Sequence, residues 1–151
     1  MRLIFNITAF TLLAARIGIA VERESFDNLQ NQAKAAYAKA KPEEAILLAS
    51  RAIAAEPQNP RGYFLRARFH EENHEPAKAI ADYDQVINLD PRQPDPWQHR
   101  GGEHFKLGHI KESLADFDKF IALSPQQAPY HWQRGISLYY AGRFEDGRKQ
   151  F

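Results

Sequence analysis

The chain has 151 residues, of which 44% are hydrophobic and 26% are charged, and its formal net charge at pH 7 is +1. This composition is typical of a soluble globular or repeat protein, and a near-neutral chain without a dense basic cluster is not expected to bind nucleic acid. The absence of cysteine excludes a disulfide framework, a thiolate metal site and a lipid-modified N-terminal cysteine.

The segment at residues 1–20 has the features of an export signal. A positive N-terminus is followed by a mostly apolar stretch over residues 3–15, and Gly18 and Ala20 offer small side chains at the two positions that a signal peptidase reads. The stretch is shorter than the about 20 apolar residues that a spanning helix needs. We expect residues 1–20 to be a signal peptide and the protein to be exported, periplasmic or secreted. An uncleaved N-terminal anchor helix or a plain N-terminal helix are the alternatives.

Prolines recur at a constant interval in the rest of the chain. Pro57, Pro91 and Pro125 are evenly spaced, each closes an amphipathic stretch, and apolar residues within these stretches repeat every three or four positions, which is the helical period. A unit of this size cannot bury its own apolar face, so it must stack on its neighbours. We predict an all-α solenoid of stacked antiparallel helix hairpins, without a sheet. The expected units are residues 26–59, 60–93, 94–127 and a partial unit at 128–151.

Small residues recur where the two helices of each hairpin would approach most closely. These pairs are Ala33 and Ala45, Ala67 and Ala79, Gly101 and Ser113, and Gly135 and Gly147. Larger side chains at these positions would push the helices apart. Pro42 and Pro76 stand where second helices are expected to begin, and a missing N–H is harmless at a helix start.

The third unit resembles the tetratricopeptide-repeat family. It reads Trp97-x2-Arg100-Gly101-x2-His104, then Ser113-x3-Phe117 and Pro125, against the family pattern Trp-x2-Leu-Gly-x2-Tyr, Ala-x3-Phe and Pro. The resemblance covers roughly residues 26–151. It implies a right-handed superhelix whose first helices line a concave face, and a non-catalytic scaffold that binds a protein or peptide there.

The same resemblance places the partner-binding side chains on the first helix of each unit. The candidates are Lys34, Tyr37, Phe64, Arg68, Gln98, His99, Phe105, Trp132, Gln133 and Tyr139. Aromatic and arginine side chains dominate the energetics of protein interfaces, so we expect an extended peptide or a partner helix to dock here. Alternatively, Trp132, Tyr139 and Tyr140 pack against elements that follow Phe151.

Family members that bind chaperones grip a C-terminal carboxylate with Lys, Asn and Arg side chains from three successive repeats. The matching positions here hold Gln30, Lys34, Leu65, Asp95 and His99, and a shift by one unit gives Phe64, Arg68, His99, Pro129 and Gln133. Neither set reproduces the clamp, so we expect a different ligand. We expect no cofactor, and the oligomeric state stays open.

One motif suggests an enzyme instead. His70-Glu71-Glu72-Asn73-His74 matches the His-Glu-x-x-His pattern, in which two histidines hold zinc and the glutamate activates water. A zinc-dependent hydrolase is therefore the alternative function. However, His74 falls at the turn position that Gly108 and Gly142 occupy in later units, so the two imidazoles would not share a helix face. We interpret the motif as a chance match and expect no metal.

Three arginines also recur at the same interval as the prolines: Arg66, Arg100 and Arg134. These arginines could form a row of cations along the groove. Asp82 and Asp116 lie opposite the first two in an antiparallel hairpin, however, so we predict ion pairs within the hairpins. Gln150 would face Arg134 in the same scheme.

The interval between the prolines also predicts where the next repeat would end. One further interval after Pro125 would place the next proline beyond Phe151, where the sequence given ends. We therefore expect the sequence to be truncated in its fourth repeat. The missing part would hold more repeats or a separate domain, and the repeats would then support or oligomerise that domain.

Overall fold

The computed structural model describes residues 24–150, so the expected signal segment at 1–20 lies outside the described part. The elements are α2 (Phe26–Ala38), α3 (Pro42–Ala55), α4 (Pro60–Glu72), α5 (Pro76–Leu89), α6 (Pro94–Lys106), α7 (Ile110–Leu123), the 3₁₀-helix η1 (Pro125–Tyr130), α8 (Trp132–Tyr140) and α9 (Phe144–Arg148). Within residues 24–150 there is no β-strand, and no helix there is both long and apolar enough to cross a membrane.

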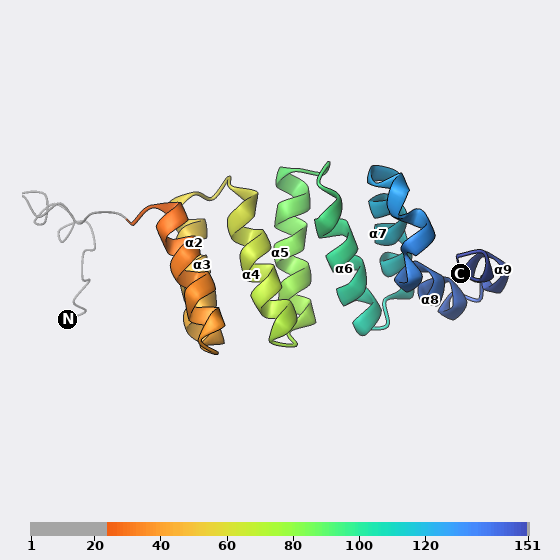
Figure 1. Ribbon diagram of the computed structural model, residues 1–151, viewed down its shortest axis with the longest axis horizontal. Coiled ribbons are helices and arrows are strands. Elements are labelled where there is room, and N and C mark those ends of the chain that lie inside the picture. The colour runs from red at the N-terminus through yellow and green to blue at the C-terminus, as the bar shows by residue number, and fades with distance from the viewer. Residues whose placement is uncertain (1–23, 151) are drawn as a thin grey trace, which may run out of the picture.

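The helices follow one another in chain order along one row (Figure 1). Each helix packs against the next, most extensively within the pairs α2–α3, α4–α5 and α6–α7, and α4 also contacts α2 directly. Each pair is a helix hairpin, and its apolar side is covered by the neighbouring hairpin. The predicted all-α solenoid of stacked hairpins is confirmed.

Prolines determine where several helices start and stop. Pro42, Pro60, Pro76 and Pro94 each occupy the first turn of a helix, where their fixed φ is compatible with the helix and no hydrogen bond is lost. Pro57, Pro91 and Pro125 follow the ends of α3, α5 and α7, because the residue before a proline disfavours the helical conformation. The predicted helix starts at Pro42 and Pro76 and the predicted helix ends before Pro57, Pro91 and Pro125 are confirmed.

The turns inside the hairpins share one conformation. The residues at the turn position are Ala40 with φ 56°, His74 with φ 57°, Gly108 with φ 75° and Gly142 with φ 73°. All four lie in the left-handed region, which glycine adopts readily and other residues adopt at a cost. His74 therefore lies in a turn, as predicted, after α4 has ended at Glu72.

The predicted close contacts between paired helices are present. Ala33, Ala45, Ala67, Ala79 and Ser113 are all fully buried. A Cβ added to Gly101 would lie 2.8 Å from the Phe117 ring, and one added to Gly147 would lie 3.2 Å from the carbonyl oxygen of Gly135. Small side chains thus let α2, α4, α6 and α8 approach their partner helices.

The fourth hairpin starts differently from the others. Within the predicted partial unit at residues 128–151, the first α-helix begins at Trp132, after the 3₁₀-helix η1. Pro129 disfavours the α conformation at Ala128, which delays the start of the α-helix. His131 caps α8, because its Nδ1 accepts a hydrogen bond from the Arg134 backbone N–H at 3.2 Å.

Two predicted arginine–aspartate pairs hold hairpins together. Arg66 donates to both oxygens of Asp82 at 2.8 and 2.7 Å, and Arg100 donates to both oxygens of Asp116 at 2.9 and 2.7 Å. Arg134 donates to Gln150 at 3.1 Å, again as predicted. The alternative of a row of free cations is wrong, because these three guanidinium groups bond side chains in the second half of each hairpin.

The arginines also reach back to the preceding hairpin, which the sequence did not predict. Arg66 donates to Ser50 at 3.0 Å, Arg100 to Asp84 at 2.5 Å and Arg134 to Asp118 at 2.6 Å. The acceptors Ser50, Asp84 and Asp118 occupy the same position in three successive repeats. Each arginine therefore bridges the second halves of two successive hairpins.

Candidate functional site

The first helices α2, α4, α6 and α8 line a groove that consists of three adjoining pockets. The first pocket, of about 320 Å³, is lined by Gln30, Lys34, Pro60, Arg61, Phe64, Leu65, Arg68, Gln93 and Asp95. The second pocket, of about 440 Å³, is lined by Asp95, Gln98, Phe120, Ser124, Gln126, Gln127, His131, Trp132 and Gln133. The third pocket, of about 340 Å³, is lined by Glu71, Gln98, His99, Gly102, Glu103, Phe105, Lys106, Phe117, Trp132, Gln133 and Ile136.

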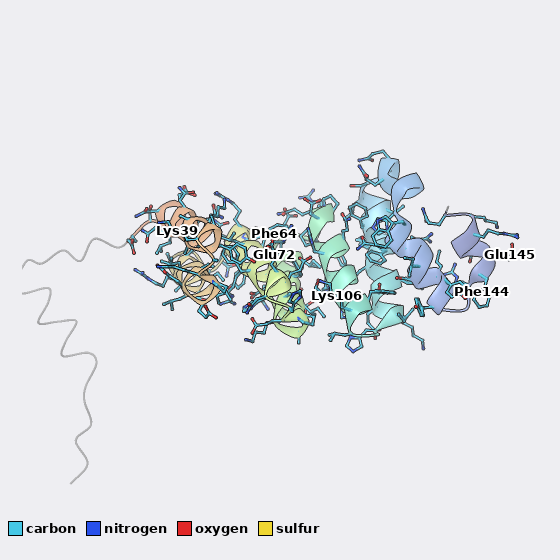
Figure 2. All side chains as sticks on the ribbon, turned by 60° about the horizontal axis from the view of Figure 1, so that its bottom comes forward. Lys39, Phe64, Glu72, Lys106, Phe144 and Glu145 are labelled. Carbon is cyan, nitrogen blue, oxygen red and sulfur yellow. The ribbon has the colours of Figure 1, made fainter. Side chains whose placement is uncertain are left out.

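Shared residues connect these pockets. Asp95 lines both the first and the second pocket, and Gln98, Trp132 and Gln133 line both the second and the third. Figure 2 shows that Phe64, which lines the first pocket, and Lys106, which lines the third, lie at different points along the row of hairpins. The groove thus runs along the first helices rather than into one hairpin.

Most of the predicted partner-binding residues line this groove. The first pocket contains Lys34, Phe64 and Arg68, and the other two contain Gln98, His99, Phe105, Trp132 and Gln133. Their contact with a partner stays a prediction.

Tyr37 and Tyr139 line none of these pockets. Tyr37 stacks on Phe69, with ring centroids 4.7 Å apart, and its hydroxyl donates to Glu72 at 3.0 Å. Tyr139 is 61% exposed and packs edge-on against Tyr140 and Phe144. Tyr37 therefore packs between the first two hairpins, whereas Tyr139 belongs to an aromatic surface at the last one.

A hydrogen-bonded network joins α4, α5 and α6 beside the third pocket. The Glu71 Oε2 atom accepts from the Tyr83 hydroxyl at 2.8 Å and lies 3.1 Å from His99 Nδ1 and 3.6 Å from Arg68 Nε. His99 Nε2 lies 3.3 Å from Arg68 Nη1. This network orients His99 in the groove.

The network keeps Glu71 ionised. Burial opposes the charged form, but the hydrogen bonds from His99 and Tyr83, followed by the charges of His99 and Arg68, lower the pKa of Glu71 to about 2. Burial raises the pKa of Tyr83, and the Glu71 charge raises it further, so this hydroxyl keeps its proton. A carboxylate therefore lies at the wall of the third pocket at neutral pH.

Aromatic contacts hold the groove side chains in place. The His99 and Tyr83 rings are stacked, with centroids 5.6 Å apart and planes 14° apart. Phe64 packs edge-on against both rings, at 5.8 Å from each. The side chains between the first and third pockets are thus preorganised, which lowers the entropy that binding would cost.

Glu103 is an acidic residue at a core position of α6. It is 1% exposed, its Oε1 accepts from Lys106 Nζ at 2.5 Å, and its Oε2 has no hydrogen-bond partner within the described part of the chain. Burial raises the pKa of Glu103, the bond from Lys106 opposes this rise, and the nearby Glu71 charge adds to it. A buried carboxylate oxygen without a donor is costly unless a ligand supplies one.

Sequence reasoning missed Glu71 and Glu103 as groove residues. Glu71 was assigned to the zinc motif. Glu103 falls at the repeat position of Phe69, which is apolar and buried, and an acidic residue at a core position is the signal that could have identified it.

The side chains of the histidine motif have separate partners. His70 Nδ1 lies 2.7 Å from Glu75, Glu71 belongs to the network with Tyr83, and His74 is exposed in its turn. Over residues 24–150, no group of three or more His, Asp and Glu side chains is placed to hold a metal ion. The motif therefore does not form the shared site that the pattern describes.

A row of helix hairpins with a groove along its first helices is the architecture of a helical-repeat protein. Two family models, both described as tetratricopeptide repeat, match residues 31–94 and residues 65–132. The chain belongs to the tetratricopeptide-repeat family. Proteins of this family are in general non-catalytic scaffolds for protein interactions.

Solved structures share the fold at low sequence identity. MamA is 15% identical, with a TM-score of 0.79 over 95% of this chain and 81% of that chain. The first repeat domain of Spaghetti (RPAP3), bound to the HSP90 peptide SRMEEVD, is 24% identical, with a TM-score of 0.64 over 72% and 86%. The Sgt2 domain from Aspergillus fumigatus is 21% identical, with a TM-score of 0.66 over 83% and 82%. No curated protein sequence matched the chain.

Proposed function

We propose that this protein is a non-catalytic scaffold that binds an extended segment of a partner protein in the groove along α2, α4, α6 and α8. The continuity of the three pockets carries this proposal, because an extended segment needs a series of adjoining sites for successive side chains. The similarity in fold to the Spaghetti domain with its bound peptide supports it.

The ligand proposed here differs from the acidic HSP90 peptide in that structure. The positions that would form a carboxylate clamp hold Gln30, Lys34, Leu65, Asp95 and His99. The third pocket adds two acidic side chains, Glu71 and Glu103. An acidic tail would find one cation in this set, Lys34, and one in the set shifted by one unit, Arg68. It would meet the carboxylates of Glu71 and Glu103 further along the groove.

Selection of peptides from a random display library on the purified protein tests the proposal. Dissociation constants of recovered peptides would be compared for the wild type and for a triple variant, Phe64→Ala, Phe105→Ala and Trp132→Ala. Loss of three aromatic contacts should weaken binding at least tenfold, which corresponds to about 1.4 kcal/mol.

The matched control is Leu47→Ala, since Leu47 is a large apolar side chain on α3 that is 62% exposed and lines none of the three pockets. It should leave binding unchanged. Circular dichroism would establish that the triple variant is folded. Unchanged affinity in a folded triple variant would contradict the groove assignment.

We also propose that the protein is exported by the segment at residues 1–20, on the basis of its sequence features. Expression of the chain in a bacterium and mass spectrometry of the periplasmic and cytoplasmic fractions test this. A periplasmic product that begins after Ala20 is the expected result, and a cytoplasmic product that retains the segment would contradict it.

A further inference from the structure

The third pocket combines apolar walls with acidic groups. Phe105 of α6 and Trp132 and Ile136 of α8 provide aromatic and aliphatic surface, and Glu71 of α4 and Glu103 of α6 provide carboxylates. Trp132 is 59% exposed, so its indole is accessible from the groove. Such a pocket suits a side chain with an apolar stem and a charged end.

Each carboxylate has one oxygen that receives no hydrogen bond from the described residues. Glu103 Oε2 is buried without a partner in the described part of the chain, while Lys106 bonds only Oε1. The contacts of Glu71 with Tyr83, His99 and Arg68 all involve Oε2, and Oε1 receives no hydrogen bond from the described residues. Two like charges at one pocket repel each other, and this repulsion falls when a cation lies between them.

The backbone of α6 leaves room for this side chain. A Cβ added to Gly102 would meet one heavy atom within 4 Å, Gln133 Nε2 at 3.9 Å, whereas the adjacent Gly101 is packed tightly against Phe117. Gly102 therefore borders open space in the pocket, and Gly101 borders the hairpin core.

We propose that the third pocket binds an arginine or lysine side chain of the partner segment. This proposal rests on the proposed function, and it specifies the chemistry of one position in the ligand. The cation donates hydrogen bonds to Glu103 Oε2 and Glu71 Oε1, and its aliphatic stem packs on Trp132 and Ile136. The Trp132 ring adds a cation–π contact. Lys106, whose side chain is 50% exposed, keeps its bond to Glu103 Oε1.

The first test uses single-residue probes and NMR spectra of the purified protein. N-acetyl-arginine amide should shift the Trp132 indole and Gly102 amide signals in a saturable way. N-acetyl-citrulline amide, which has nearly the same shape without the charge, should bind at least fivefold more weakly. Equal affinity for the two probes overturns the proposal.

Two variants assign the binding to this pocket. Glu103→Gln removes the charge and should weaken the arginine probe at least fivefold. Gly102→Leu places a side chain in the open space beside Gly102 and should abolish the shift of the Trp132 indole signal. Leu47→Ala, which changes an exposed residue that lines none of the three pockets, should leave that shift intact. If Glu103→Gln fails to fold, Gly102→Leu alone tests whether the probe binds in the third pocket. Unchanged probe binding in Gly102→Leu overturns the proposal.

The peptide selection distinguishes this proposal from the proposed function. Recovered peptides that contain arginine or lysine, and that bind Gly102→Leu more weakly, support both. Peptides that bind the groove without a basic residue overturn the basic-side-chain proposal and leave the scaffold function intact. If no peptide binds the groove, the scaffold proposal fails, and the arginine probe still decides the chemistry of the pocket.

Discussion

Arg100 of α6 and Asp116 of α7 form a bidentate pair across the third hairpin, with Nε and Nη2 of the arginine 2.9 and 2.7 Å from the two carboxylate oxygens. The Asp116 side chain is 5% exposed and that of Arg100 is 18% exposed. Arg100 also bonds Asp84 of the preceding hairpin, whose side chain is 45% exposed. One guanidinium thus has a buried partner and an exposed one.

These two partners should differ in their effect on stability. Asp116→Ala leaves a largely buried guanidinium without its main partner and should lower the free energy of unfolding by about 3 kcal/mol. Asp84→Ala removes an exposed partner and should lower it by less than about 1 kcal/mol. Urea denaturation followed by circular dichroism measures both values.

The double variant Arg100→Leu with Asp116→Leu provides the control. Because it removes both charges together, it should be more stable than Asp116→Ala. If Asp84→Ala destabilised the protein as much as Asp116→Ala, the assignment of the main pair to Asp116 would be wrong.

Replacing His74, a non-glycine residue in the left-handed conformation, by glycine should stabilise the protein. His74 has a φ of 57° and is exposed, so His74→Gly relieves backbone strain without removing packing. We expect a gain of about 0.5 to 1 kcal/mol in the free energy of unfolding, because glycine adopts this conformation without steric cost. Gly108→Ala introduces strain at the equivalent position and should cause a loss of similar size.

Asn73→Gly is the matched control for the turn, since Asn73 precedes His74 and has an ordinary φ of −84°. This substitution should bring no gain. A thermal unfolding temperature that rises for both glycine variants would contradict the role of the left-handed conformation.

Two adjacent glycines in α6 should respond in opposite directions to alanine. Gly101→Ala places a Cβ 2.8 Å from the Phe117 ring and should destabilise the protein by about 1 to 3 kcal/mol through overpacking. Gly102→Ala has room for its Cβ and should stabilise α6 by up to about 1 kcal/mol through helix propensity. Urea midpoints of the two variants test this contrast, and a loss of stability in both would show that the space at Gly102 does not exist.

Stability should depend on pH through His131. Burial against Phe117 and Phe120, with a smaller effect of the Arg134 charge, lowers the pKa of His131 below its ordinary value of 6.5. Between this ordinary value and the lower folded pKa, the unfolded chain binds the proton more readily than the folded chain does. The protein should therefore lose stability as the pH falls below about 6.5.

His131→Asn isolates this contribution, because asparagine keeps a side-chain acceptor at the start of α8 and does not titrate. The wild type should lose more stability than the variant between about pH 7.5 and about pH 5.5, as measured by urea denaturation. Equal losses would assign the pH dependence to other groups, such as His104, whose pKa is also lowered by burial.

The sequence by itself determined the repeating unit and most of its internal contacts. Because each hairpin repeats the same spacing, the turn at His74, the close approach at Gly101 and the pair of Arg100 with Asp116 all follow from the period. These contacts join residues at a set separation within one antiparallel hairpin, so the register of that hairpin is enough to predict them.

Only the tertiary structure decided the contacts between hairpins. The bond from Arg100 to Asp84, the network of Glu71 with His99, and the burial of Glu103 depend on how successive hairpins rotate and stack and on which rotamers fit between them. A linear spacing does not encode this rotation. The groove lies between hairpins, which is why the sequence identified many of its residues but not the two carboxylates of the third pocket.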